Sequence, residues 1–260
     1  MTFQTIKYDK DAKIAIVTLN RPDKLNAMNL QCVEELRQVL DAIEQDEEVW
    51  VAIVTGGDTV FSAGADISVI SSLSSPTEHY RFSRRFQQLF QRVEDLEKPV
   101  IAAVCGLALG GGCELVLACD LRIVSETARF GFPEINIGGF PAAGGTQKLP
   151  RLIGAPKAKE LLFTGAQIDG REAYRIGLVN RVVPGDQVMK EARTLAEAIS
   201  SKPKLSISKM KRLVNVGINM DLESALMYES ECLSSLSSTE DFKEGARAFL
   251  EKRKPNFVGK

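Results

Sequence analysis

Two glutamates in this sequence lie among apolar residues and glycines, where a carboxylate is unfavourable unless it has a partner or a function. Glu114 follows three glycines in GLALGGGCELVLACD (106–120), and Glu134 lies in FGFPEINIGGFPAAGGTQKLPRLIG (130–154). Each could simply stabilise the first turn of its own helix. Two carboxyl groups in one apolar pocket could instead share a proton, because burial and like charge raise at least one pKa. Such a pair is suited to acid–base chemistry on water.

The glycines beside these acids predict turns that expose backbone N–H groups to a ligand. Gly110, Gly111 and Gly112 would together cost a helix interior about 3 kcal/mol, which favours a turn and the start of a helix. N–H groups in a first helical turn have no intrahelical acceptor, and a ligand atom can approach closely where side chains are absent. FSAGADI (61–67) predicts a second tight turn, which presents the N–H of Ala65.

Hydrophobic patterning predicts an α/β core that positions these turns. Apolar runs typical of strands covered on both faces occur at 14–19, 51–56, 100–104, 121–124 and 178–183. Helical patterns lie between them, at 30–43 after a possible Asn29 cap and at 82–93 before Pro99. Strands that alternate with helices indicate parallel crossover units. After Val183 only helical patterns follow, so we expect a core over 1–190 and an all-helical region over 191–260.

Composition indicates a globular protein without a global affinity for polyanions. The 260 residues include 33 basic and 34 acidic side chains, and the net charge is −1. The five cysteines lack metal-ligand spacing and are interpreted as free core thiols. The apolar run at 100–119 contains glycines and Glu114, which favours a buried strand, turn and helix over a membrane span. MTFQTIKYDK lacks the pattern of a leader, so we predict a cytoplasmic protein with no membrane or metal partner.

Several ordered motifs resemble the crotonase (enoyl-CoA hydratase/isomerase) family. They are FSAGADI, ALGGGCELVLACD, and FGFPEI followed by PAAGGTQKLPRLIG. NRPDKLNAMN (20–29) and EGARAFLEKRKPNF (244–257) are similar to the family's two ends. The resemblance implies a spiral of ββα turns followed by a C-terminal helical region, 191–260, that completes a trimer. It also implies a homo-oligomer, either a trimer or a hexamer built as a dimer of trimers.

The resemblance assigns an oxyanion hole to two of the predicted N–H groups. Family members hold the thioester oxygen of an acyl-CoA with one N–H from each glycine-containing turn, which here are those of Ala65 and Gly111. Gly112 would lie beside the same thioester. These donors would stabilise the oxygen as it becomes enolate-like.

Contacts with coenzyme A are also implied by the resemblance. The adenine end would lie against Ala63, Asp66 and Ile67, and the pantetheine would run along Lys24, Leu25 and Ala27. Phe249 and Lys252 would approach the nucleotide from a neighbouring subunit. For Lys24 and Lys252, an ordinary solvated surface lysine is the alternative.

Three further positions bear on the substrate. Phe132 would border the acyl pocket together with the segment 68–82. Ala142 stands where the family often has glycine, so its methyl group could crowd the reacting water. Ser68 stands where a lysine is common, which could weaken the nucleotide contact.

Hydratases of this family carry both glutamates, and the sequence therefore predicts an enoyl-CoA hydratase. Glu114 would activate water, and Glu134 would deliver a proton to C2 of a trans-2-enoyl-CoA, giving a 3-hydroxyacyl-CoA. No cofactor is expected, because coenzyme A is part of the substrate. An enoyl-CoA isomerase or another acyl-CoA-processing crotonase is the alternative.

A binding module is the alternative from another functional class. Five basic residues, Lys202, Lys204, Lys209, Lys211 and Arg212, could contact RNA phosphates. The near-neutral net charge and the lack of interleaved aromatic residues disfavour nucleic acid as a partner. The one histidine, His79, is interpreted as a surface helix residue rather than a catalytic base.

Overall fold

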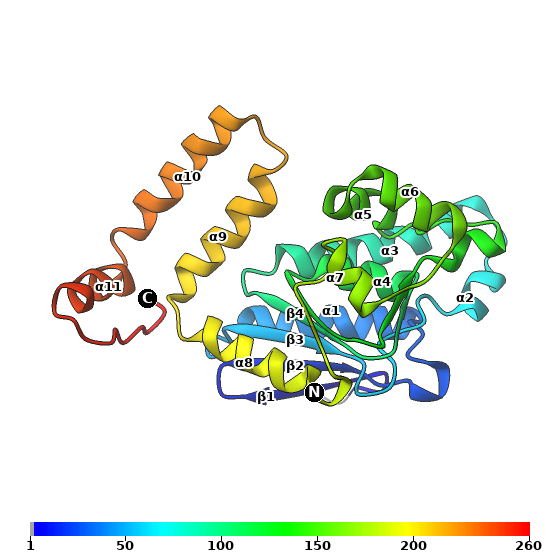
Figure 1. The fold of residues 1–260 in the computed structure, drawn as a ribbon, viewed down its shortest axis with the longest axis horizontal. Helices are drawn as coiled ribbons and strands as arrows, with labels where there is room; N and C mark the ends of the chain where they lie inside the picture. The colour runs from blue at the N-terminus through cyan, green and yellow to red at the C-terminus, as the bar shows by residue number, and fades with distance from the viewer. Residues whose placement is uncertain (1–2) are drawn as a thin grey trace.

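A six-stranded sheet lies at the centre of the core (Figure 1). The computed structural model describes residues 3–260. The strand order is β1-β2-β3-β4-β6-β9; all neighbours are parallel except β1 and β2, which pair antiparallel. The bounds are β1 (Ile6–Asp11), β2 (Ile14–Leu19), β3 (Val51–Thr55), β4 (Val100–Val104), β6 (Leu121–Ser125) and β9 (Arg181–Val183). The parallel α/β core is confirmed.

The central strands are buried on both faces, as their continuous apolar sequences predict. Every residue of β3 and of β4 is buried. One set of alternating strand residues packs with α1 (Leu30–Gln45), α3 (Pro76–Asp95) and α4 (Gly111–Ala118). The other set packs with α8 (Val188–Ser200). The predicted Asn29 cap is confirmed, because its side chain accepts a hydrogen bond from the N–H of Cys32.

Four short or polar strands were not expected from the sequence. β1 is a charged edge strand, IKYDKD, with one buried residue. A second sheet, in the order β5-β7-β8, contains β5 (Leu107–Leu109), β7 (Arg129–Gly131) and β8 (Ile168–Asp169). These strands are two or three residues long, too short for a pattern of alternation. β5 leads directly into the triple-glycine turn, and β7 leads to Glu134.

The remaining elements are short. They are the 3-10 helices η1 (Pro22–Lys24), η2 (Pro133–Ile137) and η3 (Gly185–Gln187), and the helices α2 (Ile67–Ser72), α5 (Gly145–Ile153), α6 (Ala155–Thr164) and α7 (Gly170–Arg175). All five cysteines are buried free thiols, which agrees with their interpretation as core residues.

The last three helices form an arm that projects from the core (Figure 1). They are α9 (Lys204–Gly217), α10 (Leu222–Leu236) and α11 (Glu240–Leu250). The expected boundary between residues 190 and 191 falls inside α8, which still packs on the sheet. Lys211 ties α9 to the core through an ion pair with Asp120 of 2.8 Å, and the Lys211 side chain is only 7% exposed.

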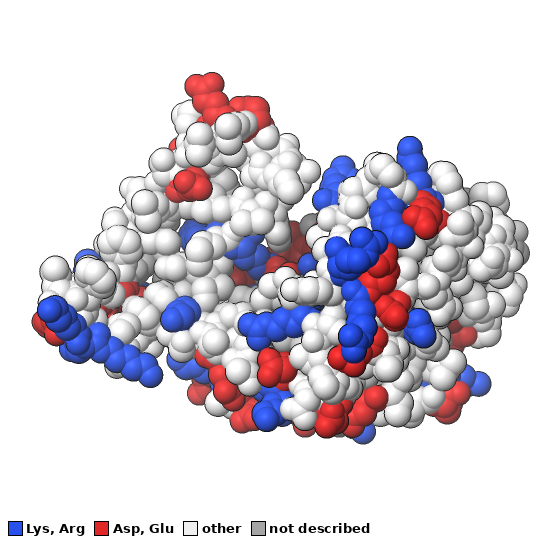
Figure 2. All heavy atoms as spheres, in the orientation of Figure 1, with Lys and Arg blue, Asp and Glu red and all other residues white. Residues whose placement is uncertain are grey.

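Much of the arm surface is apolar. Figure 2 shows few charged residues along most of the arm on the face that is drawn. Exposed large hydrophobic side chains on the arm include Met210, Val214, Ile218, Leu222, Leu226, Met227, Leu233, Phe249 and Leu250. Lys204 and Lys211 of the basic cluster are paired with Glu47 and Asp120, so this cluster is not a row of free cations.

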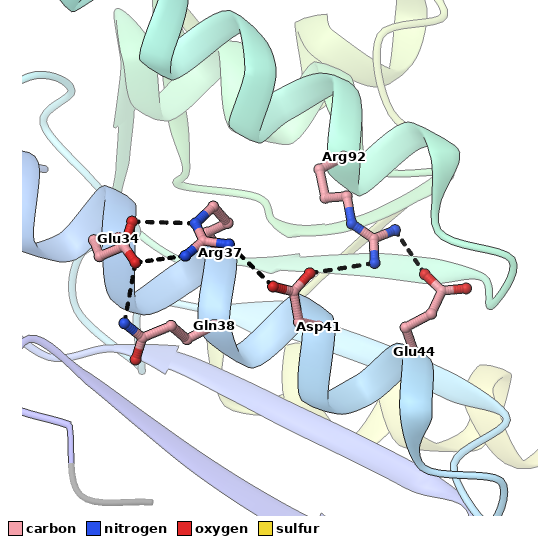
Figure 3. Close-up of polar contacts among 6 residues, drawn as sticks. All are labelled: Glu34, Arg37, Gln38, Asp41, Glu44 and Arg92. Carbon is pink, nitrogen blue, oxygen red and sulfur yellow. Dashed lines mark hydrogen bonds and ion pairs between the residues drawn. The ribbon is translucent and has the colours of Figure 1, made fainter.

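A line of charged side chains connects α1 to α3 (Figure 3). Arg37 pairs with Glu34 at 2.7 Å and with Asp41 at 3.1 Å, both on α1. Arg92 of α3 reaches back to Asp41 at 3.4 Å and to Glu44 at 2.6 Å. Each pair is partly exposed and contributes only about 0 to 1 kcal/mol. Only the two pairs of Arg92 bridge the helices, and they supplement the apolar packing of α3 on α1.

Candidate active site

Glu114 lies in the first turn of α4 and is 3% exposed. Its Oε1 accepts two hydrogen bonds of 2.7 Å, from the N–H groups of Ala143 and Gly145 in the PAAGG loop. The pKa of Glu114 is raised to about 7, chiefly by burial and in smaller part by the charge of Glu134; the two N–H donors and Lys148 act in the opposite direction. A carboxyl group poised near neutral pH is suited to taking and returning a proton.

Glu134 lies in the first turn of η2, with its side chain turned inward. Its Oε2 is buried and has no hydrogen-bond partner among residues 3–260, and burial raises the pKa of its carboxyl group. A buried polar oxygen without a partner is unfavourable and is unusual in folded proteins. This oxygen is therefore available to a substrate or a water molecule. A Cβ atom at Gly110 would lie 2.6 Å from Oε1 of Glu134, and the carbonyl of Gly110 accepts the N–H of Glu114 at 2.9 Å, so both predicted acids lie at the same turn.

Gly110 separates β5 from α4 and lies against Glu134. Its backbone has φ +50° and ψ −124°, a conformation that favours glycine, and its N–H donates to the carbonyl of Gly131 at 2.9 Å. A Cβ atom at this position would lie 2.6 Å from Oε1 of Glu134. The predicted turn and helix start are confirmed, and the structure adds that the turn packs directly against the second acid.

The N–H groups of Ala65 and Gly111 come from two turns in backbone contact. A Cβ atom at Gly111 would lie 3.3 Å from the nitrogen of Ala65, and one at Gly64 would lie 3.1 Å from the nitrogen of Gly111. Within the described part of the chain, neither N–H has a hydrogen-bond acceptor. The two donors singled out from the sequence are thus brought together, and both can donate to a ligand atom.

Ser62 joins the two turns and was not identified from the sequence. It is 0% exposed; its Oγ donates to the carbonyl of Asn26 at 2.8 Å and accepts the N–H of Gly64 at 3.1 Å. Its own carbonyl accepts the N–H of Leu109 at 3.0 Å, and a Cβ atom at Gly112 would lie 2.4 Å from that carbonyl oxygen. The only sequence signal was a small polar residue between Phe61 and Ala63.

We expect Ser62→Ala to lower kcat by about tenfold with a smaller effect on KM. The hydroxyl accepts the N–H of Gly64 and so fixes the residue that precedes Ala65. Its loss should loosen the neighbouring Ala65 donor, and a full donor is worth about 10²–10³ in kcat. The matched control is Ser125→Ala, because the buried Ser125 hydroxyl also accepts the N–H two residues ahead, that of Thr127. Steady-state kinetics of both variants measures the difference; equal losses would contradict a role specific to the site.

The residues expected along coenzyme A lie on neighbouring segments beside Ala65. The N–H of Ala63 donates to the carbonyl of Leu25 at 2.9 Å, and Met28 forms a parallel bridge with Ala65, so Ala27 lies beside the same turn. Leu25 and Ile67 are apolar yet 51% and 56% exposed, and Lys24 is exposed in η1. These side chains form a surface next to the two donors.

Asp66 has structural partners within the chain. Its carboxylate caps α2 by accepting the N–H of Ser68 at 3.1 Å, and it pairs with Arg21 at 3.0 Å. The Ser68 hydroxyl also donates to Asp66 at 2.7 Å. Ser68 therefore supports the turn at the position where the family commonly has a lysine.

Three other residues expected at the site, Phe132, Ala142 and Gly112, each contact a different part of the surrounding structure. Phe132 is 1% exposed, and its ring packs closely against Gly145 beneath the PAAGG loop. Ala142 accepts a hydrogen bond through its carbonyl from Gln87 of α3 at 2.7 Å. Gly112 is buried against Ser62.

Phe249 and Lys252 are not brought to the site within one chain. Figure 1 places α11, which contains Phe249, at the opposite end of the molecule from α2. His79 is exposed on α3, as predicted. Across residues 3–260, no helix combines the length and apolar character needed to cross a bilayer.

Comparison with known families assigns the chain to a class. The family model described as Enoyl-CoA hydratase/isomerase matches residues 9–260. The chain therefore belongs to this family, which confirms the resemblance predicted from the ordered motifs.

Individual relatives agree over the full length. The chain is 43% identical over 261 residues to the crotonyl-CoA hydratase of Syntrophomonas wolfei, with 100% of both sequences covered. It is 45% identical to the short-chain-enoyl-CoA hydratase of Clostridium acetobutylicum, covering 98% of this chain and 97% of that protein. A crystal structure of an enoyl-CoA hydratase from Bacillus anthracis has a TM-score of 0.95 at 38% identity and covers 99% of this chain and 100% of that one. The crotonase-like fold is thus confirmed.

Proposed function

We propose that this protein adds water across the 2,3 double bond of a short trans-2-enoyl-CoA, giving a 3-hydroxyacyl-CoA, and catalyses the reverse dehydration. It is a hydro-lyase of the enoyl-CoA hydratase type. The observation that carries the proposal is a pair of inward-facing carboxyl groups at one glycine turn, next to two N–H donors that have no acceptor among residues 3–260. The names of its relatives, crotonyl-CoA hydratase and short-chain-enoyl-CoA hydratase, support a short acyl chain.

The two acids divide the proton transfers. Glu114, held by Ala143 and Gly145, takes a proton from water as the water oxygen bonds to C3. The electrons of the double bond move toward the thioester, whose oxygen accepts hydrogen bonds from the N–H groups of Ala65 and Gly111. Glu134, protonated at the outset, gives its proton to C2. One proton thus enters and one leaves the pair, and the sum is the addition of one water molecule.

Coenzyme A would run along the surface beside Ala65, with Leu25 and Ala27 on the pantetheine and Ala63 and Ile67 near the adenine. Asp66 would act there mainly through the turn that it caps. No cofactor takes part, because coenzyme A is a portion of the substrate.

We further propose a homotrimer, alone or as a hexamer, assembled through the arm. The exposed apolar side chains of α9, α10 and α11 support this, since contiguous apolar surface marks an interface. Phe249 and Lys252, remote from the site of their own chain, would then reach the nucleotide of a neighbouring subunit.

The proposed function is tested by following the ultraviolet absorbance of the conjugated enoyl thioester in crotonyl-CoA. Rapid loss of this absorbance, with 3-hydroxybutyryl-CoA as product, is expected. Migration of the double bond of a 3-enoyl-CoA without hydration would instead favour the isomerase alternative. Lack of activity combined with salt-sensitive RNA retention would favour a binding module.

A further inference from the structure

A chain of short hydrogen bonds connects the surface of α3 to Glu114 from outside the pocket. Nη1 of Arg84 donates to Oε1 of Gln87 at 2.7 Å, and Nε2 of Gln87 donates to the carbonyl oxygen of Ala142, also at 2.7 Å. That carbonyl belongs to the peptide unit whose N–H, on Ala143, donates to Oε1 of Glu114 at 2.7 Å. A guanidinium and a carboxylate are therefore joined through two consecutive amide groups.

Both amides are oriented in the same sense. Each accepts a hydrogen bond at its oxygen and donates one from its nitrogen, so each bond polarises the next and strengthens it by roughly 10–30%. The cation of Arg84 at the outer end adds to this polarisation, and the bond at the inner end is assisted by the charge of the carboxylate. The Ala143 N–H is consequently a stronger donor than an isolated peptide N–H.

We propose that Arg84 and Gln87 are positioning residues that hold and polarise the 142–143 peptide, and through it orient Glu114 and support its ionised form during water activation. Both act through the peptide rather than by touching the reacting atoms. The inference rests on the proposed function in one respect, the role of Glu114 as the group that accepts a proton from water.

The helix that carries Arg84 and Gln87, α3, is held in place by its own N-cap and by contacts with the core. Its first turn has a capping box made by Ser75 and Glu78. Arg92, on the same helix, is paired with Asp41 and Glu44 of α1 (Figure 3). The capping box stabilises the start of α3, while the Arg92 pairs and the buried side chains of Phe86 and Phe90 hold the helix on the core, so Gln87 can hold the PAAGG loop instead of following its movements.

Other charged groups face the same site and set its background. Glu134 of η2 raises the pKa of Glu114, and Lys148 of α5 lowers it. Lys148 is itself paired with Glu94 of α3 at 2.7 Å. The ionisable side chains that also line the groove around Gln87 are Tyr80, Arg92 and Asp95. None of these charged residues is changed in the variants below, so they do not account for differences between the pH profiles of the variants and the wild type.

The first variant is Gln87→Met, which keeps the length of the side chain and removes its donor. The Ala143 N–H then becomes a weaker donor, the pKa of Glu114 rises, and the acidic limb of kcat/KM against pH moves to higher pH. We expect a shift of about half to one pH unit, which is about a three- to tenfold loss on that limb. The plateau at high pH should change little.

The second variant is Arg84→Met, which removes the cation at the outer end. It should shift the limb in the same direction but by less, because this charge is exposed and screened by solvent. Added salt should reduce the difference from the wild type. Arg84→Lys keeps a cation and should restore most of the wild-type profile.

Matched controls lie on the same helix. Gln91→Met makes the same change one turn further along, where the amide bonds to Asp95 at 3.0 Å instead of the loop. Arg85→Met removes a cation that lines the groove between α1 and α3. Both should leave the limb in place. A Gln87→Met profile lowered equally at every pH, or an equal shift in Gln91→Met, would overturn the proposal.

A second measurement separates this inference from the proposed function. The infrared pH-difference spectrum of the substrate-free wild type, minus that of Glu114→Gln, isolates the carboxyl band of Glu114. Its titration midpoint should rise in Gln87→Met by the same half to one unit, roughly. An unchanged midpoint would overturn the inference that Gln87 acts on Glu114 through the 142–143 peptide. A wild type that is inactive on crotonyl-CoA would instead overturn the proposed function, and this titration would still test the role of Gln87.

Discussion

Glu114→Gln is expected to lower kcat for crotonyl-CoA hydration by about 10³-fold or more, with a small change in KM. The amide cannot take a proton from water, and general acid–base catalysis by one group contributes about 10²–10⁴ in rate. The variant should still fold, because its side-chain oxygen can accept the N–H groups of Ala143 and Gly145 as the carboxylate does. Steady-state rates against the exposed Glu160→Gln as control give the measurement; activity within tenfold of the wild type would remove Glu114 from the mechanism.

The same substitution should stabilise the protein at high pH. The pKa of Glu114 is raised from an ordinary value of 4.5 to about 7, so the folded state binds one proton more than the unfolded state between these values. Stability therefore falls as pH rises from about 4.5 to 7, by about 3 kcal/mol in all. The Glu114→Gln variant has no carboxyl group at this position, so its free energy of unfolding should not fall over this pH range. Urea unfolding should show its advantage over the wild type near pH 8, and the advantage should shrink toward pH 5; the opposite trend would contradict the sign of the shift.

Gly110→Ala is expected to produce the second large loss, about 10²-fold in kcat. The new methyl group would lie 2.6 Å from Oε1 of Glu134, and the backbone there has φ +50°. The carboxylate is the end of a flexible side chain and moves more easily than the backbone, so the acid is displaced from C2 while the fold persists. The strained backbone adds about 1–3 kcal/mol of destabilisation.

The control for this variant is Gly177→Ala, which isolates backbone strain. Gly177 has φ +81°, and a Cβ atom there would meet nothing within 4 Å. It should therefore lose stability without losing kcat. Kinetics and thermal unfolding of both variants separate the two effects; equal kcat values in Gly110→Ala and Gly177→Ala would show that contact with Glu134 is unimportant.

The core could be predicted because its strands are long enough to show a pattern. IAIVTL and VIAAV are continuous apolar runs, and β2 and β4 have the predicted bounds. β5, β7 and β8 have at most three residues, and their existence depends on pairing with distant segments rather than on their own composition.

The candidate site was predictable only in part, for a related reason. Glycines beside carboxylates indicated turns and buried acids, and the family resemblance assigned Ala65, Gly111 and both glutamates their proposed roles. The supporting contacts have no such local signal. Gln87 meets Ala142 across 55 positions, and Ser62 meets Asn26 across 36. Neither glutamine nor serine is unusual in its own segment, so only the folded chain reveals what they hold.

The ion pair between Lys211 and Asp120 connects the arm to the end of α4. Asp120 lies two residues beyond the end of α4, and Gly111 is the first residue of that helix. Eight helical residues extend about 12 Å. The arm is thus joined to one end of this short helix, and the other end carries the N–H of Gly111, one of the two donors proposed to bind the thioester oxygen. If subunits assemble through the arm as proposed, α4 would connect the subunit interface to the proposed active site, and a change in subunit contacts could reach that site through this one helix.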